Sequence, residues 1–244
     1  MWGTVRMSAL DEGGPPDRPR APARRPRVVL IDVFETMLRV EGLGARFVDV
    51  GRPEHEWELF FTRTLRDGMA LTLAGGLRPF AEMARAALRT TTGHQLSEQA
   101  LDHVLAGFRE LPPHPDVEPA LMALARARVP AYAFTHGTGA VACDALDRAG
   151  LRTYLRGVHS TEQIGVFKPP ARAYHWACRQ VDAPADRVGL LAAHSWDVHG
   201  AVRAGLVGGL ATRLEGAVPA VVTAPHIVGV GLDEVVDELL ALPA

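Results

Sequence analysis

The sequence has few cysteines, no long apolar run and almost no net charge. Cys143 and Cys178 are its only two cysteines, which excludes a disulfide framework, and their helical surroundings favour small buried side chains over a nucleophile. No apolar run approaches the roughly 18 to 20 residues that span a bilayer. A formal charge of −2 gives no indication of nucleic acid or an anionic membrane as a partner. We expect a cytoplasmic protein.

The N-terminal stretch lacks hydrophobic periodicity. Residues 1–26 are dense in proline, glycine and arginine, a composition typical of a disordered arm. The arm has no apolar core of the kind that a secretory signal requires. Its arginines could contact a partner, but a solvated tail is the stronger expectation.

The next segment is an apolar run that ends in an acid. Val28 to Ile31 run directly into Asp32, as in a buried strand of a parallel sheet, which shows no polar alternation. Open α/β sheets place their ligands at the carboxyl ends of such strands. Taken alone, Asp32 is also compatible with a helix cap or a turn.

The rest of the chain divides into a helical block and an alternating block. Helical spacing without a strand signal covers residues 40–111, and strands alternate with helices after the proline-rich segment that begins at Pro112. This predicts an α/β fold, a Rossmann-like doubly wound parallel sheet, over 27–39 and 112–244, with 40–111 inserted as a helical cap. The predicted strands cover 28–32, 130–134, 157–160, 188–193 and 207–212, with an edge strand at 227–230.

Four chemically useful side chains follow or lie near the predicted strand ends. They are Asp32, Thr135, Lys168 and Asp197, and the topology brings the carboxyl ends of parallel strands to one edge. A carboxylate nucleophile needs a nearby cation to stay ionised, which Lys168 can supply. Each residue alone has an ordinary structural explanation, but the ordered set favours a catalytic site.

These segments resemble the four motifs of the haloacid dehalogenase superfamily, and within it the type II 2-haloacid dehalogenase group. The matching segments are Asp32-Val33-Phe34-Glu35-Thr36, Phe134-Thr135-His136-Gly137, Phe167-Lys168-Pro169-Pro170 and His194-Ser195-Trp196-Asp197. The resemblance implies a Rossmann-like core with a helical cap inserted after the first motif. It makes Asp32 the nucleophile, Thr135 a hydroxyl contact, Lys168 the charge partner, and Asp197 the acid that orients or activates water. It also allows a homodimer.

Two departures from the phosphatase pattern indicate which reaction is favoured. Phe34 stands where phosphatases of this superfamily carry a general acid, and Ala193 stands where they carry an aspartate that helps to hold Mg²⁺. Halide leaves carbon without being protonated, and a carboxylate attacks carbon without a metal. The sequence therefore predicts no cofactor. If Mg²⁺ is bound, as the phosphatase alternative requires, Asp32 and Asp197 are its expected ligands.

Several further side chains are candidates for contact with a small anionic substrate. His136 and His194 stand where dehalogenases carry asparagine, and His194 is also a candidate base for the second step. No arginine matches the cap arginine of the dehalogenases. The remaining candidates are Phe34, Thr36 and Gly137 in the motifs and Trp57, Phe60, Phe61, Arg63 and Arg66 in the first cap helix.

The favoured function is hydrolytic dehalogenation of a small 2-haloalkanoic acid through an ester on Asp32. Two alternatives remain: a phosphatase with an altered site, and a module that binds a metabolite without turnover. Release of halide without Mg²⁺ supports dehalogenation, and Mg²⁺-dependent release of phosphate supports the phosphatase. If neither product is released, the binding module is favoured.

Overall fold

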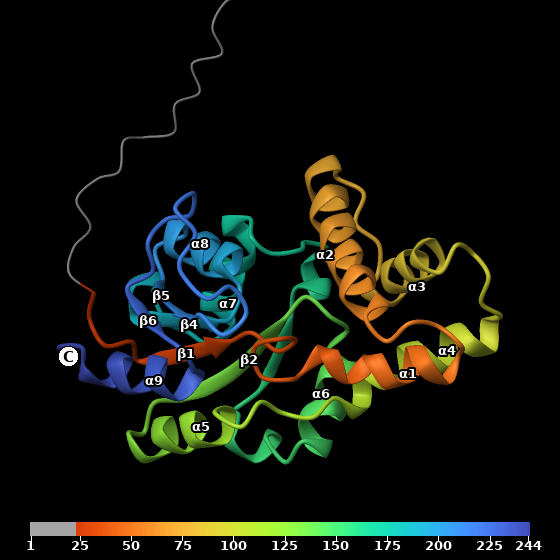
Figure 1. Cartoon of the computed structure of the whole chain (residues 1–244). Helices are drawn as coiled ribbons and strands as arrows, with labels where there is room; N and C mark the ends of the chain where they lie inside the picture. Colours follow the sequence, from red (N-terminus) through yellow and green to blue (C-terminus); the bar gives the residue numbers. More distant parts are fainter. Residues whose placement is uncertain (1–22) are drawn as a thin grey trace, which may run out of the picture.

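A six-stranded parallel sheet forms the centre of the structure, a computed structural model that describes residues 23–244. The order of the strands is β3-β2-β1-β4-β5-β6 (Figure 1), which confirms the predicted doubly wound sheet. The strands are β1 (Val28–Ile31), β2 (Ala131–Thr135), β3 (Val158–Ser160), β4 (Val188–Ala192), β5 (Val207–Ala211) and β6 (Ile227–Gly229).

Helices cover both faces of this sheet, because successive side chains of a strand point to opposite faces. On β1, Val29 and Ile31 join the apolar core of one face, whereas Val28 and Leu30 join that of the other. The first face carries α5 (Val117–Arg126), α6 (Gly139–Arg148) and α9 (Leu232–Ala241), and the second carries α7 (Ala171–Gln180) and α8 (Ser195–Arg203). A strand buried on both faces explains the unbroken apolar run in the sequence.

The strand order places the end of β1 at the point where the winding of the sheet reverses. The chain passes from β1 to β2 and β3 on one side, and then crosses to β4, β5 and β6 on the other. Ile31 pairs with Ala133 of β2 and with Leu191 of β4. Open α/β sheets bind ligands at such a reversal, so Asp32 occupies the favoured position.

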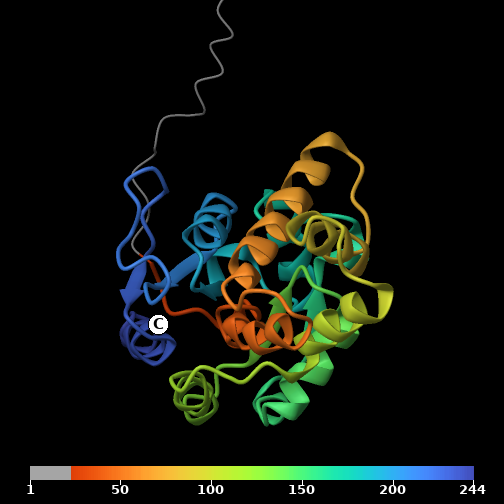
Figure 2. The same cartoon turned by 45° about the vertical axis from the view of Figure 1, so that its right-hand side comes forward.

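Helices are inserted between β1 and α5, where the sequence predicts them. These inserted helices are η1 (Val40–Leu43), α1 (Gly44–Asp49), α2 (Glu56–Ala74), α3 (Phe80–Thr91), α4 (Glu98–Ala106) and η2 (Gly107–Glu110). They stand beside the carboxyl edge of the sheet (Figures 1 and 2). Their interior is aromatic and includes Phe47, Phe60 and Phe108. The exact domain boundaries stay a prediction.

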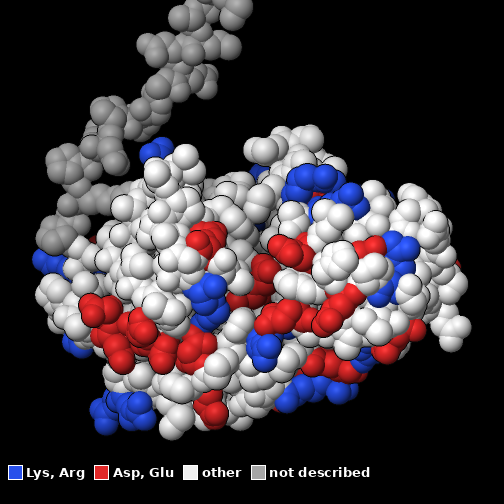
Figure 3. Space-filling model, viewed as in Figure 1, with Lys and Arg blue, Asp and Glu red and all other residues white. Residues whose placement is uncertain are grey.

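The remaining short helices complete the connections of the sheet. They are η3 (Arg152–Tyr154) and η4 (Thr161–Ile164), on either side of β3, and η5 (Ala185–Arg187) before β4. Within residues 23–244 no helix is long and apolar enough to cross a membrane. Acidic and basic side chains are interspersed on the face shown in Figure 3.

The last four residues of the segment predicted as an N-terminal arm belong to the described structure. Residues 1–22 lie outside the described part of the chain, whereas Arg25 contacts the C-terminal segment. The Arg25 backbone N–H donates to the carbonyl of Pro243, and its guanidinium donates to the carbonyl of Leu240. These long-range contacts order a segment whose composition alone indicates disorder.

Candidate active site

Asp32 lies at the centre of a buried polar network directly after β1. Lys168 Nζ donates to Asp32 Oδ1 over 2.8 Å, and the Thr36 hydroxyl donates to Oδ2 over 2.7 Å. Burial by itself raises the pKa of a carboxyl group, but the charges of Lys168 and His194 hold the pKa of Asp32 well below its usual range. Asp32 is therefore an ionised and oriented carboxylate, as a nucleophile must be.

Lys168 joins this carboxylate to a second one. Its Nζ also lies 2.5 Å from Asp197 Oδ2, and it donates to the carbonyl of Phe134. Burial alone lowers the pKa of a lysine, but Asp197 and Asp32 reverse this and raise the pKa of Lys168. The hydroxyl of Tyr174 donates to Asp197 Oδ1 over 2.7 Å. Both carboxylate oxygens of Asp197 therefore have partners within the protein.

The other side of Asp32 faces an imidazole held between two acids. His194 Nδ1 lies 3.2 Å from Asp32 Oδ2, and its Nε2 lies 2.7 Å from Glu35 Oε2. Burial alone lowers the pKa of His194, but these two carboxylates outweigh burial and raise the pKa to about 10. His194 is thus a cation at neutral pH while Asp32 is ionised.

Glu35 reaches His194 from a backbone conformation that is uncommon for its residue type. Its φ is +65°, in the left-handed region that costs a side chain with a Cβ roughly 1–2 kcal/mol. The turn is closed by hydrogen bonds from Glu35 N to Leu38 O and from Met37 N to Val33 O. Non-glycine residues in such conformations persist where the surroundings fix them, and they concentrate at functional sites.

The donor set of this site does not fit a divalent metal. The Lys168 ammonium occupies the position between Asp32 and Asp197 that a bridging cation needs. In residues 23–244 no group of three or more His, Cys, Asp or Glu side chains is arranged to hold a metal ion. Magnesium wants several oxygen ligands in octahedral geometry, so the pair of ligands expected under the phosphatase alternative is not arranged for that role.

An aromatic wall lies beside Asp32. The ring of Phe34 stacks on Phe80 at 6.2 Å between centroids and meets the edge of Phe108 at 5.3 Å. Phe167 continues the wall, lying 6.4 Å from Phe80 with nearly parallel planes. A phenyl ring has no proton to transfer, so this position offers no acid to a leaving alkoxide.

The loop after β2 brings a neutral histidine to the same place. His136 stacks on Phe167 at 4.1 Å, and burial together with Lys168 lowers its pKa well below the usual value. Its Nδ1 is buried with no partner within the described chain. Thr135 Oγ1 accepts the backbone N–H of Gly137 over 2.9 Å, and this bond fixes the loop.

The candidates on α2 make contacts elsewhere. Phe60 and Phe61 pack against Phe108, one ring removed from Phe34. The Arg63 guanidinium donates to the hydroxyl of Thr91, and Arg66 pairs with Asp67 on the surface. Trp57 lines a separate surface pocket together with Arg39, Glu41, Gly42, Glu54, His55 and Pro112. The structure therefore does not bring these candidates to Asp32, because their faces of α2 serve packing and solvent.

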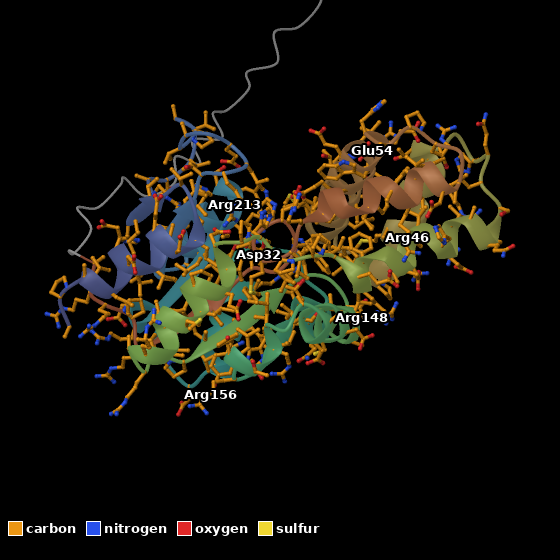
Figure 4. The ribbon with its side chains drawn as sticks, turned by 60° about the horizontal axis from the view of Figure 1, so that its bottom comes forward. Asp32, Arg46, Glu54, Arg148, Arg156 and Arg213 are labelled. Carbon is orange, nitrogen blue, oxygen red and sulfur yellow. The ribbon has the colours of Figure 1, made fainter. Side chains whose placement is uncertain are left out.

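Three contributors to the site carried no signal in the sequence. Glu35 contacts His194 and Tyr174 contacts Asp197, as described above. Arg213 donates to the carbonyl of Thr36 while it pairs with Asp116. Figure 4 shows Asp32 where the sheet meets the inserted helices, with Arg213 toward the sheet and Glu54 and Arg46 on the far side. Only Glu35 lies within a recognised motif, and its backbone conformation is not readable from residue type.

A family profile for haloacid dehalogenase-like hydrolases matches residues 26–205. The chain belongs to this family of hydrolases. The match confirms the resemblance on which the motifs were interpreted, and it covers most of the sheet together with the inserted helices. It ends inside the connection from α8 to β5.

This chain is similar to several 2-haloacid dehalogenases, both in sequence and in structure. The chain is 26% identical over 180 residues to (S)-2-haloacid dehalogenase 1 of a Pseudomonas species, covering 72% of this chain and 79% of the relative. It is 28% identical over 178 residues to (S)-2-haloacid dehalogenase H-109 of Pseudomonas putida, covering 71% and 80%. The L-2-haloacid dehalogenase of Xanthobacter autotrophicus with covalently bound chloropropionic acid has a TM-score of 0.81 at 20% identity, covering 88% and 98%. At 20% identity, this structural similarity supports the fold of the chain alone.

Proposed function

We propose that this hydrolase removes halide from a small 2-haloalkanoic acid through an ester on Asp32. The observation that carries the proposal is a buried, ionised Asp32 carboxylate, held by Lys168, beside Phe34 rather than beside an acid. The 2-haloacid dehalogenases among the relatives support the same substrate class.

In the first step, a carboxylate oxygen of Asp32 attacks the carbon that bears the halogen. A carbon–oxygen bond forms, the carbon–halogen bond breaks, and halide leaves with the bonding electrons. Lys168 and Thr36 orient the attacking carboxylate. The unpartnered Nδ1 of His136 is available to hydrogen-bond an anionic part of the substrate. No proton is transferred, which matches the absence of an acid at Phe34.

In the second step, water attacks the carbonyl carbon of the Asp32 ester. Esterification removes the charge of Asp32, one of the two charges that raise the pKa of His194, so the pKa of His194 falls and the imidazolium can release its proton. The neutral ring then accepts a proton from water at Nδ1, while Glu35 orients it through Nε2. The bond between the carbonyl carbon and the substrate oxygen then breaks, His194 returns its proton to that oxygen, and the hydroxy acid leaves. The second proton of the water leaves the new carboxyl group, so the Asp32 carboxylate is restored and the His194 imidazole is protonated again.

This assignment moves water activation from Asp197 to His194. The two oxygens of Asp197 are engaged by Lys168 and Tyr174, whereas His194 lies beside the carboxylate that becomes the ester. Asp197 then acts by holding Lys168. We also propose that the reaction needs no metal, so an excess of EDTA leaves halide release unchanged, and a loss that Mg²⁺ restores contradicts this.

Single turnover in ¹⁸O-labelled water tests the covalent mechanism. With excess enzyme and (S)-2-chloropropionate, we expect one ¹⁸O atom in Asp32 after turnover, measured by peptide mass spectrometry, because water attacks the carbonyl carbon of the ester. Label found only in the lactate product contradicts the ester. If a panel of haloacids and phosphate esters is not hydrolysed, and Asp32→Asn leaves ligand binding intact, the protein is a binding module instead.

A further inference from the structure

A mostly apolar pocket, partly open to solvent, borders the aromatic wall of the site. Its cavity has a volume of about 320 Å³, within the usual range for small-molecule pockets. Most of its lining is apolar and comes from two inserted helices, the 3₁₀ turn after them and the start of α6. The lining residues are Phe80, Ala81, Ala84, Arg85, Asp102, Leu105, Ala106, Phe108, Arg109, Thr138 and Val141.

Phe80 connects this pocket with the aromatic wall of the site. Phe80 lines the pocket, and the same ring stacks on Phe34 and on Phe167 at centroid distances of 6.2 and 6.4 Å. Phe34 follows the nucleophile by two residues, and Phe167 precedes Lys168. Phe80 is therefore shared by the wall of the site and the pocket, as is Phe108, which lines the pocket and meets the ring of Phe34.

The backbone of Phe80 is anchored to the sheet domain. Its N–H donates to Glu162 Oε1 over 3.1 Å, and the Thr138 hydroxyl donates to the same oxygen over 3.4 Å. Glu162 lies in η4, directly after β3. The start of α3 is thereby tied to η4 and to Thr138, which lines the pocket, so the fold fixes the position of Phe80.

The charged groups around the pocket are already paired. Arg85 forms ion pairs with Glu98 and Asp102, and Arg109 forms one with Asp144. The remaining lining is hydrocarbon together with the Thr138 hydroxyl. An apolar chain fits such a lining, whereas a second carboxylate has no unpaired cation to meet in it.

We propose that Phe80 is the specificity-determining residue that limits the length of the carbon chain at C2 of the substrate. With Phe80 in place, the pocket is shut off from Asp32 and short 2-haloacids are preferred. With the ring removed, the pocket receives an apolar chain of several carbons. This inference rests on the proposed dehalogenation and adds a boundary to its substrate class.

Substitution of Phe80 tests the inference through a ratio of two substrates. We expect Phe80→Ala to raise kcat/KM for (S)-2-bromohexanoate relative to (S)-2-bromopropionate about tenfold or more, since burying even one methylene in an apolar pocket is worth about tenfold. Phe80→Leu keeps an apolar side chain at this buried position and is the second variant if Phe80→Ala does not fold. Folding is checked by circular dichroism and by halide release from the short substrate.

A second substitution identifies the pocket as the place where the chain binds. Ala81→Phe, added to the Phe80 variant, fills the pocket and is expected to remove the gain on bromohexanoate. Ala86→Phe is the matched control, because Ala86 is also exposed on α3 but lines a different pocket. Its addition is expected to keep the gain.

The outcomes separate this inference from the proposed function. Halide release from bromopropionate with an unchanged substrate ratio in both Phe80 variants overturns the inference and leaves dehalogenation standing. Equal use of both substrates by the unsubstituted protein also overturns it. If no variant, nor the unsubstituted protein, releases halide from either substrate, the proposed function itself fails.

Discussion

The carboxyl edge of the sheet and the inserted helices use the same charged residue types under opposite conditions. At the sheet edge, Lys168 is fully buried and holds Asp32 and Asp197. On the inserted helices, Arg85 and Asp102 pair with side-chain exposures of 34% and 65%. Solvent screens the second kind of pair, which contributes about 0–1 kcal/mol, whereas loss of one partner from the first leaves a buried charge and costs about 3–5 kcal/mol.

This difference indicates that the sheet edge determines the charges of the site, whereas the inserted helices determine the shape of its wall. The sheet edge fixes the charge state of Asp32 through largely buried groups. The inserted helices contribute rings such as Phe80 and Phe108 to the wall, while their arginines keep other partners. Changes at the edge are therefore expected to alter rate, changes at the junction to alter stability, and changes on the outer helix surface to alter little.

The largest effect is expected at Glu35, on the sheet side of the comparison. Glu35→Gln removes the one carboxylate charge that still faces His194 after Asp32 is esterified. The imidazole is then a weaker base, so the second step slows by about 10²-fold or more. We expect the ester on Asp32 to accumulate in rapid-quench mass spectrometry, while halide is still released in a burst. His194→Asn is expected to give the same accumulation.

A nearby carboxylate provides the control for this prediction. Glu41 pairs with Arg39 on the surface, and Glu41→Gln is expected to leave the rate of ester hydrolysis unchanged. If Glu35→Gln lowers halide release without accumulation of ester, Glu35 instead supports the first step. If His194→Asn keeps appreciable activity, His194 serves only as a hydrogen-bond donor.

An intermediate effect is expected where the two regions touch. A Cβ on Gly68 of α2 would lie 2.4 Å from the ring of Phe167, and the Thr72 hydroxyl accepts the backbone N–H of Phe167 over 2.9 Å. Gly68→Ala is therefore expected to lower the free energy of unfolding by about 1–3 kcal/mol, measured by urea denaturation. Helix propensity alone favours alanine by about 1 kcal/mol, so a loss identifies the contact.

Gly76→Ala is the matched control for the junction. No heavy atom lies within 4 Å of a Cβ built on Gly76, and this position follows the end of α2. We expect a change within about 0.5 kcal/mol. A gain in stability for Gly68→Ala contradicts the tight junction, because it means that α2 moves away from Phe167 without cost.

The smallest effect is expected on the outer surface of the inserted helices. Arg66 pairs with the adjacent Asp67 in an exposed position, so Arg66→Ala is expected to change the free energy of unfolding by less than about 1 kcal/mol and the KM for 2-chloropropionate by less than about twofold. A tenfold rise in KM contradicts this expectation and restores Arg66 as the group that binds the substrate carboxylate.

The sequence by itself determined the sheet and the members of the core network. Apolar runs buried on both faces identify parallel strands, and the ends of those strands share one edge. These two facts were enough to predict that Asp32, Lys168 and Asp197 lie close together. The network depends on the topology of the sheet, and the alternation of strands and helices in the sequence predicts that topology.

Only the tertiary structure decided which groups surround that network. Glu35 reaches His194 because its backbone adopts a positive φ, and Phe80 closes the wall because Glu162 anchors it from a distant segment. Arg63 and Arg66 have the right chemistry for an anion but lie on faces of α2 with other partners. Residue type and spacing do not specify where a side chain points once a helix packs, since that direction follows from contacts made across the whole fold.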